Sequence, residues 1–141
     1  ASDVYKRQEE LCQALPFKVN SLGYISDTST MVAAYSCADL FVIPSLEDNL
    51  PNTIMESMAC GTPCVGFEIG GIPEMIDHRV NGYVANYKDA GDLANGIQWV
   101  LEHEDRLALS DACVKKVQEN YTEEVVAKQY TALYEKLLKG E

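Results

Sequence analysis

The fold is decided by residues 40–67, LFVIPSLEDNLPNTIMESMACGTPCVGF. Leu40–Pro44 form a continuous apolar run of strand length, which is typical of a strand covered on both faces of a parallel sheet. A helix is predicted next, because Pro51 is tolerated in a first helical turn and Gly61 can end a helix in the left-handed conformation. Residues 63–67, PCVGF, read as a second buried strand. Two buried strands joined by a helix predict a parallel α/β architecture.

The surrounding segments continue this alternation of strands and helices. Upstream, residues 17–25 are predicted to form a short strand, followed by a helix that is capped by Asp27 or Thr28 and ends near Cys37. The buried stripe of the central helix is predicted to be Ile54, Met55, Met58 and Ala59. Downstream, the expected elements are a short helix through Met75 and Ile76, a strand at 83–85, and helices over 93–101, 104–119 and 122–138. The fold class is therefore α/β, a parallel Rossmann-like sheet with helices on both faces, closed by C-terminal helices.

The composition and charge of the chain exclude several classes of function. The chain has 141 residues, of which 47% are hydrophobic and 23% charged, as in one ordinary globular domain. Its formal net charge of -11 disfavours nucleic-acid binding, because a phosphate backbone would be repelled. The five cysteines contain no C-x-x-C pair and are interpreted as buried thiols, not as a metal site. The first residues lack the pattern of a secretory signal, so we expect a cytoplasmic protein.

Two carboxylates and a helix terminus suggest a binding site. In open parallel sheets, ligands bind at the carboxyl ends of the strands, where the helix after Pro51 would point its free N–H groups. The amides of Asn52 and Thr53 would suit a phosphate, while Asp48 and Glu56 would suit sugar hydroxyls. Together these features describe a nucleotide sugar. The residues alone leave a second interpretation open, in which Asp48 helps to cap the helix and Glu56 is a solvated helix residue.

The longer motif resembles a known family. PSLEDNLPNTIMESMACGTPCVGFEIGGIPEMI, preceded by ADLFVIP and followed by NGYV, is similar to the donor-binding segment of glycosyltransferase family 4, whose members are retaining enzymes of the GT-B fold. The similarity runs from about Val19 to the C-terminus. It implies the C-terminal half of a GT-B fold and transfer of a sugar from a UDP- or GDP-sugar to an acceptor hydroxyl, with no metal or other cofactor. It also implies a role in polysaccharide biosynthesis.

The resemblance assigns roles to individual residues. In the family, two glutamates with seven residues between them bind the sugar hydroxyls and the ribose, which places the ribose contact at Glu56 and the sugar contact at Asp48. The adjacent Glu47 is the alternative sugar contact. Asn52 and Thr53 match positions whose amides meet the diphosphate. The other carried-over donor-binding positions are Asn49, Leu50, Tyr24 and Ile25, of which the last two would edge the nucleobase.

The resemblance also covers two glycines, and it implies that other parts of the family's active site lie outside this chain. Gly70 and Gly71 match paired glycines of the family, although a structural turn explains them equally well. No catalytic residue is expected in this chain, because the family's arginine and lysine at the leaving group lie upstream. The acceptor, a glycan or a lipid-linked sugar, would bind an N-terminal domain that lies outside the chain and could hold the protein at a membrane surface. We therefore expect no sugar transfer by these 141 residues alone.

Three expectations remain open. A sugar-nucleotide epimerase of GT-B fold would share the crevice but need its own acid–base residues. A non-catalytic nucleotide-sugar-binding module would make the two carboxylates dispensable. Finally, residues 3–8, DVYKRQ, resemble a translated sequencing adapter, so residues 1–8 are expected to be non-native and 9–141 to be a partial C-terminal nucleotide-sugar-binding domain.

Overall fold

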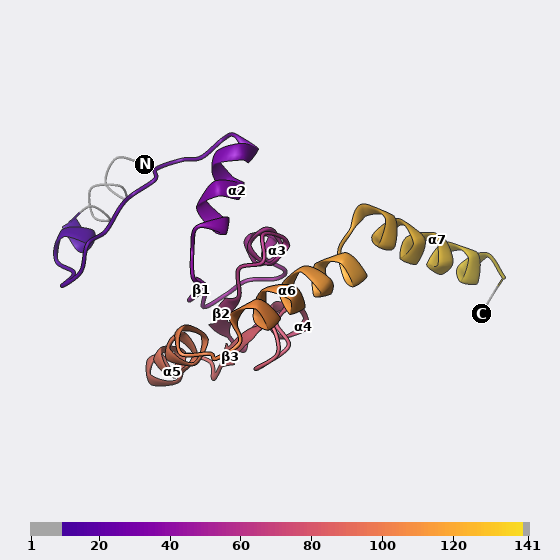
Figure 1. Ribbon diagram of the computed structural model, residues 1–141. Helices are drawn as coiled ribbons and strands as arrows, with labels where there is room; N and C mark the ends of the chain where they lie inside the picture. The colour runs from indigo at the N-terminus through magenta and orange to yellow at the C-terminus, as the bar shows by residue number, and fades with distance from the viewer. Residues whose placement is uncertain (1–9, 140–141) are drawn as a thin grey trace.

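The computed structural model describes residues 10–139, so the expected adapter segment, residues 1–8, lies outside the described residues. Helices and strands alternate from residue 28 to residue 101, and two further helices follow (Figure 1). In order they are α2 (Thr28–Ser36), β1 (Phe41–Ile43), α3 (Asn52–Ala59), β2 (Cys64–Phe67), α4 (Ile72–Met75), β3 (Gly82–Ala85), α5 (Ala90–Leu101), α6 (Arg106–Asn120) and α7 (Glu123–Lys139). The predicted helices and the strands from Leu40 onward are confirmed, with boundaries shifted by a few residues.

The strands form one parallel sheet in the order β1-β2-β3. Phe41 pairs with Cys64, and Cys64 pairs in turn with Gly82. Each connection between neighbouring strands contains a helix, as parallel pairing requires. All three strands therefore end at the same side of the sheet, which we call the carboxyl edge.

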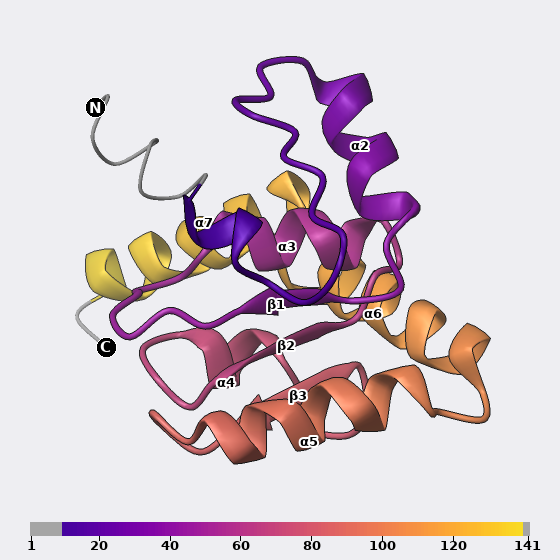
Figure 2. The same cartoon turned by 90° about the vertical axis from the view of Figure 1, so that its left-hand side faces the viewer.

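Helices cover both faces of the sheet, as predicted (Figure 2). Successive residues of β2 point to opposite faces, so Cys64 lies in one core cluster and Val65 in another. The first cluster consists of Ile43, Ile54, Met58, Cys64, Ile72, Met75, Ile76 and Cys113. The second consists of Val65, Phe67, Tyr83, Ala85, Val100 and Leu109. Helices α3 and α4 thus pack on one face and α5 on the other, while α6 contributes Cys113 to the first cluster and Leu109 to the second.

Helix α3 ends as its sequence predicts, but its buried face differs from the predicted one. Gly61 adopts a φ of 77° and its N–H donates to Met58, while the Thr62 N–H donates to Ser57, which together make a Schellman motif. The Ser57 hydroxyl donates back to the Thr62 carbonyl and is fully buried. Ser57 therefore takes the place predicted for Ala59, which is exposed.

The predicted strand at residues 17–25 is wrong. The structure has no regular element at residues 18–26, and the side chains of Phe17 and Leu22 are each 65% exposed. A strand needs a neighbour for its N–H and C=O groups. Among the described strands, β1 pairs only with β2, so the β-forming residues of 17–25 have no ladder to join.

The last two helices differ in how they pack. Helix α6 lies against α3 and buries Leu109 and Cys113. Helix α7 has no buried residue and extends away from the sheet (Figure 1). Closure of the fold by C-terminal helices is thus due to α5 and α6. Among the described residues, no helix combines the length and apolar composition needed to cross a membrane.

Candidate nucleotide-sugar site

The candidate site is built on the β1–α3 loop, residues 44–51, at the carboxyl edge. Two other loops at this edge hold it in place. The Asn49 carbonyl accepts a 2.5 Å hydrogen bond from the Gly71 N–H in the loop after β2. The Leu46 carbonyl accepts a 3.0 Å hydrogen bond from the Tyr87 hydroxyl in the loop after β3. The path of the loop is therefore fixed through its main chain.

The paired glycines allow this close approach. A Cβ added at Gly70 would overlap the carbonyl oxygen of Asp48, and one added at Gly71 would overlap that of Asn49. Gly70 also adopts a φ of 53°, in the left-handed region that favours glycine. A turn alone would explain the φ of Gly70 but not the contacts of Gly71. Both glycines are needed because the β1–α3 loop lies directly against them.

The predicted sugar contact and its alternative differ in burial. Asp48 is half-buried in the loop, whereas Glu47 and Asn49 are exposed. The side chain of Leu50 is 44% exposed and lines an apolar groove formed mainly by α7 and the residues just before it. Of Asp48 and Glu47, Asp48 is the one whose backbone carbonyl lies directly against Gly70.

The start of α3 offers free amide donors. Pro51 occupies the N-cap position and has no side chain that could accept from the first amides of the helix. The side chains of Asn52 and Thr53, which follow it, are exposed. Helix N–H groups without a cap, together with the positive end of the helix dipole, suit an anionic ligand.

Glu56 is exposed but is not simply a solvated residue. Its Oε2 accepts a 3.2 Å hydrogen bond from the hydroxyl of Tyr35 on α2. Burial, followed by the nearby Glu56 charge, raises the pKa of Tyr35 to about 12, so its hydroxyl keeps its proton at neutral pH. The spacing of Met31, Val32 and Tyr35 places them on one face of α2, which predicts packing and does not reveal this contact.

The remaining predicted residues lie in the segment before α2. Tyr24 is 89% exposed and Ile25 is half-buried, in a stretch without regular structure. Their role at the nucleobase stays a prediction.

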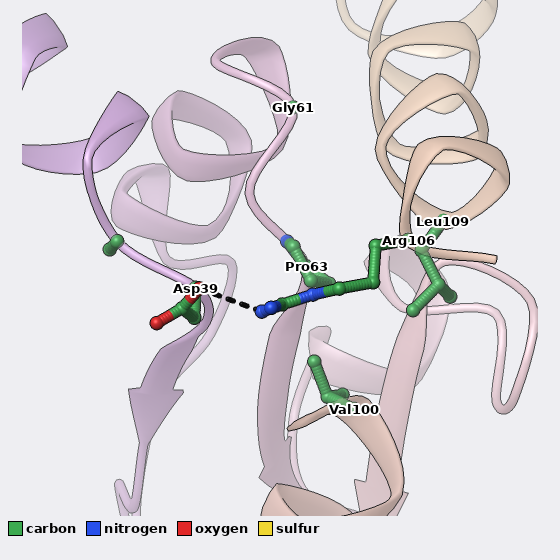
Figure 3. A pocket seen from close by; sticks show the side chains of 7 residues that line it. Asp39, Gly61, Pro63, Val100, Arg106 and Leu109 are labelled. Carbon is green, nitrogen blue, oxygen red and sulfur yellow. Dashed lines mark hydrogen bonds and ion pairs between the residues drawn. The ribbon is translucent and has the colours of Figure 1, made fainter. Parts of the chain in front are cut away.

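A second cavity lies at the opposite edge of the sheet (Figure 3). It has a volume of about 160 Å³ and is lined by Ala38, Asp39, Gly61, Pro63, Val100, Arg106 and Leu109. Its two charged groups pair with each other, because Arg106 Nη2 lies 2.7 Å from Asp39 Oδ1. The cavity is separate from the carboxyl edge, and its lining offers no unpaired charged group to a nucleotide sugar.

Only some of the cysteines are buried, although the sequence predicted buried thiols for all five. Cys64 and Cys113 are buried, and burial raises the pKa of each to about 12, but Cys37 is exposed. All five cysteines are free thiols. Within residues 10–139, no three His, Cys, Asp or Glu side chains come together in a way that could hold a metal ion.

Comparison with known proteins identifies the family. Residues 2–103 match the model of the family described as glycosyl transferases group 1. The chain belongs to this glycosyltransferase family. A relative of this glycosyltransferase chain is the N,N'-diacetylbacillosaminyl-diphospho-undecaprenol alpha-1,3-N-acetylgalactosaminyltransferase of Campylobacter jejuni. The two are 31% identical over 92% of this chain and 35% of the relative.

Solved glycosyltransferase structures share the fold. Sucrose-phosphate synthase from Thermosynechococcus elongatus aligns with a TM-score of 0.82 at 30% identity, over 99% of this chain and 35% of that one. Anabaena HepE, solved in complex with UDP and glucose, aligns with a TM-score of 0.80 at 21% identity, over 95% of this chain and 37% of that one. These neighbours confirm the predicted α/β fold class of the glycosyltransferase. The chain spans about a third of the length of the relatives that it matches.

Proposed function

We propose that this chain is the donor-binding part of a retaining family 4 glycosyltransferase, which transfers a sugar from a nucleotide-diphosphate sugar to an acceptor hydroxyl. One observation carries the proposal. The β1–α3 loop is clamped against Gly70 and Gly71, beside the uncapped amides of α3. This arrangement holds Asp48 and the helix terminus in a fixed relation before any ligand arrives.

Each group then has a distinct task. The amides of Asn52 and Thr53 bind the diphosphate, whose negative charge the end of α3 favours. Glu56 accepts from the ribose hydroxyls, and Asp48 accepts from the hydroxyls of the sugar. The half-burial of Asp48 favours it over the exposed Glu47 for this role. Basic groups outside this chain would meet the charge that grows on the leaving group.

The first test is nucleotide binding by calorimetry. UDP is the first probe, because one fold neighbour is solved with it, and GDP is the second. Replacing Glu56 by alanine leaves the ribose hydroxyls without their acceptor, which costs about 1–3 kcal/mol, or roughly 5- to 150-fold in affinity. Glu104→Ala is the control, because Glu104 is exposed and lies between α5 and α6, away from the carboxyl edge.

The outcomes separate the possible functions. If the unchanged protein binds neither nucleotide, or if Glu56→Ala binds as tightly as Glu104→Ala, the donor site is not here. Transfer is assayed on a protein that includes both this chain and an acceptor-binding domain. An epimerase would convert the donor sugar without an acceptor, and a binding module would give no product. We expect the 141 residues alone to bind nucleotide without transferring sugar.

A further inference from the structure

We propose that Tyr35 is a positioning residue for donor binding, whose hydroxyl orients the Glu56 carboxylate toward the ribose. The inference rests on the proposed function, in which Glu56 is the ribose contact. It adds a residue on a different helix, 21 positions earlier in the chain, to a site otherwise made at the carboxyl edge. Tyr35 itself is not expected to touch the donor.

The structure fixes Tyr35 at three points. Its ring packs edge-on against Phe41 of β1, with ring centroids 5.6 Å apart and planes at 86°. Its backbone carbonyl accepts a 2.7 Å hydrogen bond from the Thr62 hydroxyl. Its own hydroxyl donates to Oε2 of Glu56 at 3.2 Å. The Tyr35 hydroxyl is thus a hydrogen-bond donor held by β1 and by the loop before β2, and it can fix the orientation of a side chain on α3.

The Glu56 side chain needs such a partner to hold one orientation. It is exposed, so without a partner it would sample several rotamers, and fixing one of them when the nucleotide binds would cost side-chain entropy. A carboxylate offers about four acceptor positions on its two oxygens. The tyrosine occupies one of them on Oε2, which leaves Oε1 and the remaining position to accept from two neighbouring hydroxyls, such as those of a ribose.

The competing explanation is that the hydrogen bond only ties α2 to α3. Tyr35→Phe separates the two, because it keeps the ring against Phe41 and removes only the hydroxyl. Tyr121→Phe is a matched control. The Tyr121 hydroxyl also donates at 3.2 Å, to the Glu74 carbonyl, and joins two other parts of the chain.

The experiment measures binding of UDP and of 2′,3′-dideoxy-UDP to the wild-type protein and to the Tyr35→Phe, Tyr121→Phe and Glu56→Ala variants. Because 3.2 Å is long for an O–H···O hydrogen bond, whose usual range is about 2.5–3.0 Å, we expect a three- to tenfold loss of UDP affinity in Tyr35→Phe. The dideoxy nucleotide should bind wild type and Tyr35→Phe equally, and Tyr121→Phe should bind UDP as wild type does. Adding Tyr35→Phe to Glu56→Ala should cause no further loss.

Failure of this inference is distinguishable from failure of the proposed function. If Glu56→Ala weakens UDP binding and Tyr35→Phe does not, the positioning role is wrong and the donor site stands. If Tyr35→Phe weakens both nucleotides equally, the tyrosine supports the fold and does not orient the carboxylate, which also overturns the inference. If Glu56→Ala binds UDP as wild type does, the ribose contact and the inference fall together.

Discussion

Replacing Gly70 by alanine should lower the stability of the protein and weaken donor binding at the same time. The left-handed conformation at this position, with a φ of 53°, costs an alanine about 1–2 kcal/mol. Its Cβ would also overlap the Asp48 carbonyl and push the β1–α3 loop away. That shift breaks the hydrogen bond between Asn49 and Gly71, worth about 0.5–1.5 kcal/mol. The free energy of unfolding should therefore fall by about 1.5–3.5 kcal/mol.

Donor affinity should fall for a separate reason. In the proposed function Asp48 contacts the sugar hydroxyls, so these hydroxyls would lose their partner once the loop moves, and an unpaired polar partner costs about 1–3 kcal/mol, or roughly 5- to 150-fold in affinity. Stability is measured by urea denaturation, and affinity by calorimetry with the intact nucleotide sugar UDP-glucose.

Gly61→Ala is the matched control for Gly70→Ala. Gly61 has a φ of 77°, so alanine has the same backbone cost, but its Cβ would overlap only with the Ser110 hydroxyl, which can rotate away. It lies before β2, at the edge away from the site, so stability should drop by about 1–2 kcal/mol with affinity unchanged. Equal losses of stability in the two variants, with normal donor binding in Gly70→Ala, would refute the reasoning that the glycine clamps the loop.

Two further predictions concern the core and the acid response. Met58→Ala should lower the free energy of unfolding by about 2–5 kcal/mol, because Met58 is fully buried, while Leu107→Ala, at a 79% exposed position, should change it by less than about 0.5 kcal/mol in the same urea titration. The Asn86 N–H and then the Tyr83 hydroxyl lower the pKa of Asp92 below its usual value of 3.8, so this contribution to stability is present above that pH and is lost as the pH falls through the folded-state pKa. Asp92→Asn should therefore destabilise the protein at pH 7 and differ less from wild type at pH 3, and an equal difference at both pH values would contradict this.

The sequence was most informative where local and long-range preferences agree. Residues 41–43 and 64–67 are apolar runs that fit a strand buried on both faces, and they pair as such. Residues 17–25 have similar strand propensity, but a strand also needs a neighbour, which no local pattern reports. Ser57 shows the same limit within one helix, because its burial comes from the cap that follows it and not from its polarity.

The sequence names candidate residues for the site, but it does not show how they are arranged in space. The spacing of Asp48 and Glu56 is visible in the sequence, as is the helix start between them. The contact of Gly71 with Asn49 joins residues far apart in the chain, so only the folded structure reveals it. Tyr35 was missed for the same reason, since its amphipathic position predicts packing and carries no sign of the carboxylate that it meets.

The way the β1–α3 loop is held has an evolutionary consequence. Its contacts with Gly71 and Tyr87 use main-chain carbonyls, at Asn49 and Leu46, and not the side chains of those residues. Substitutions at 46–49 would thus leave the loop on the same path while changing the groups that it presents. If the loop binds the donor sugar as proposed, a lineage could in this way exchange one sugar for another by single mutations, each tested by selection on an intact scaffold.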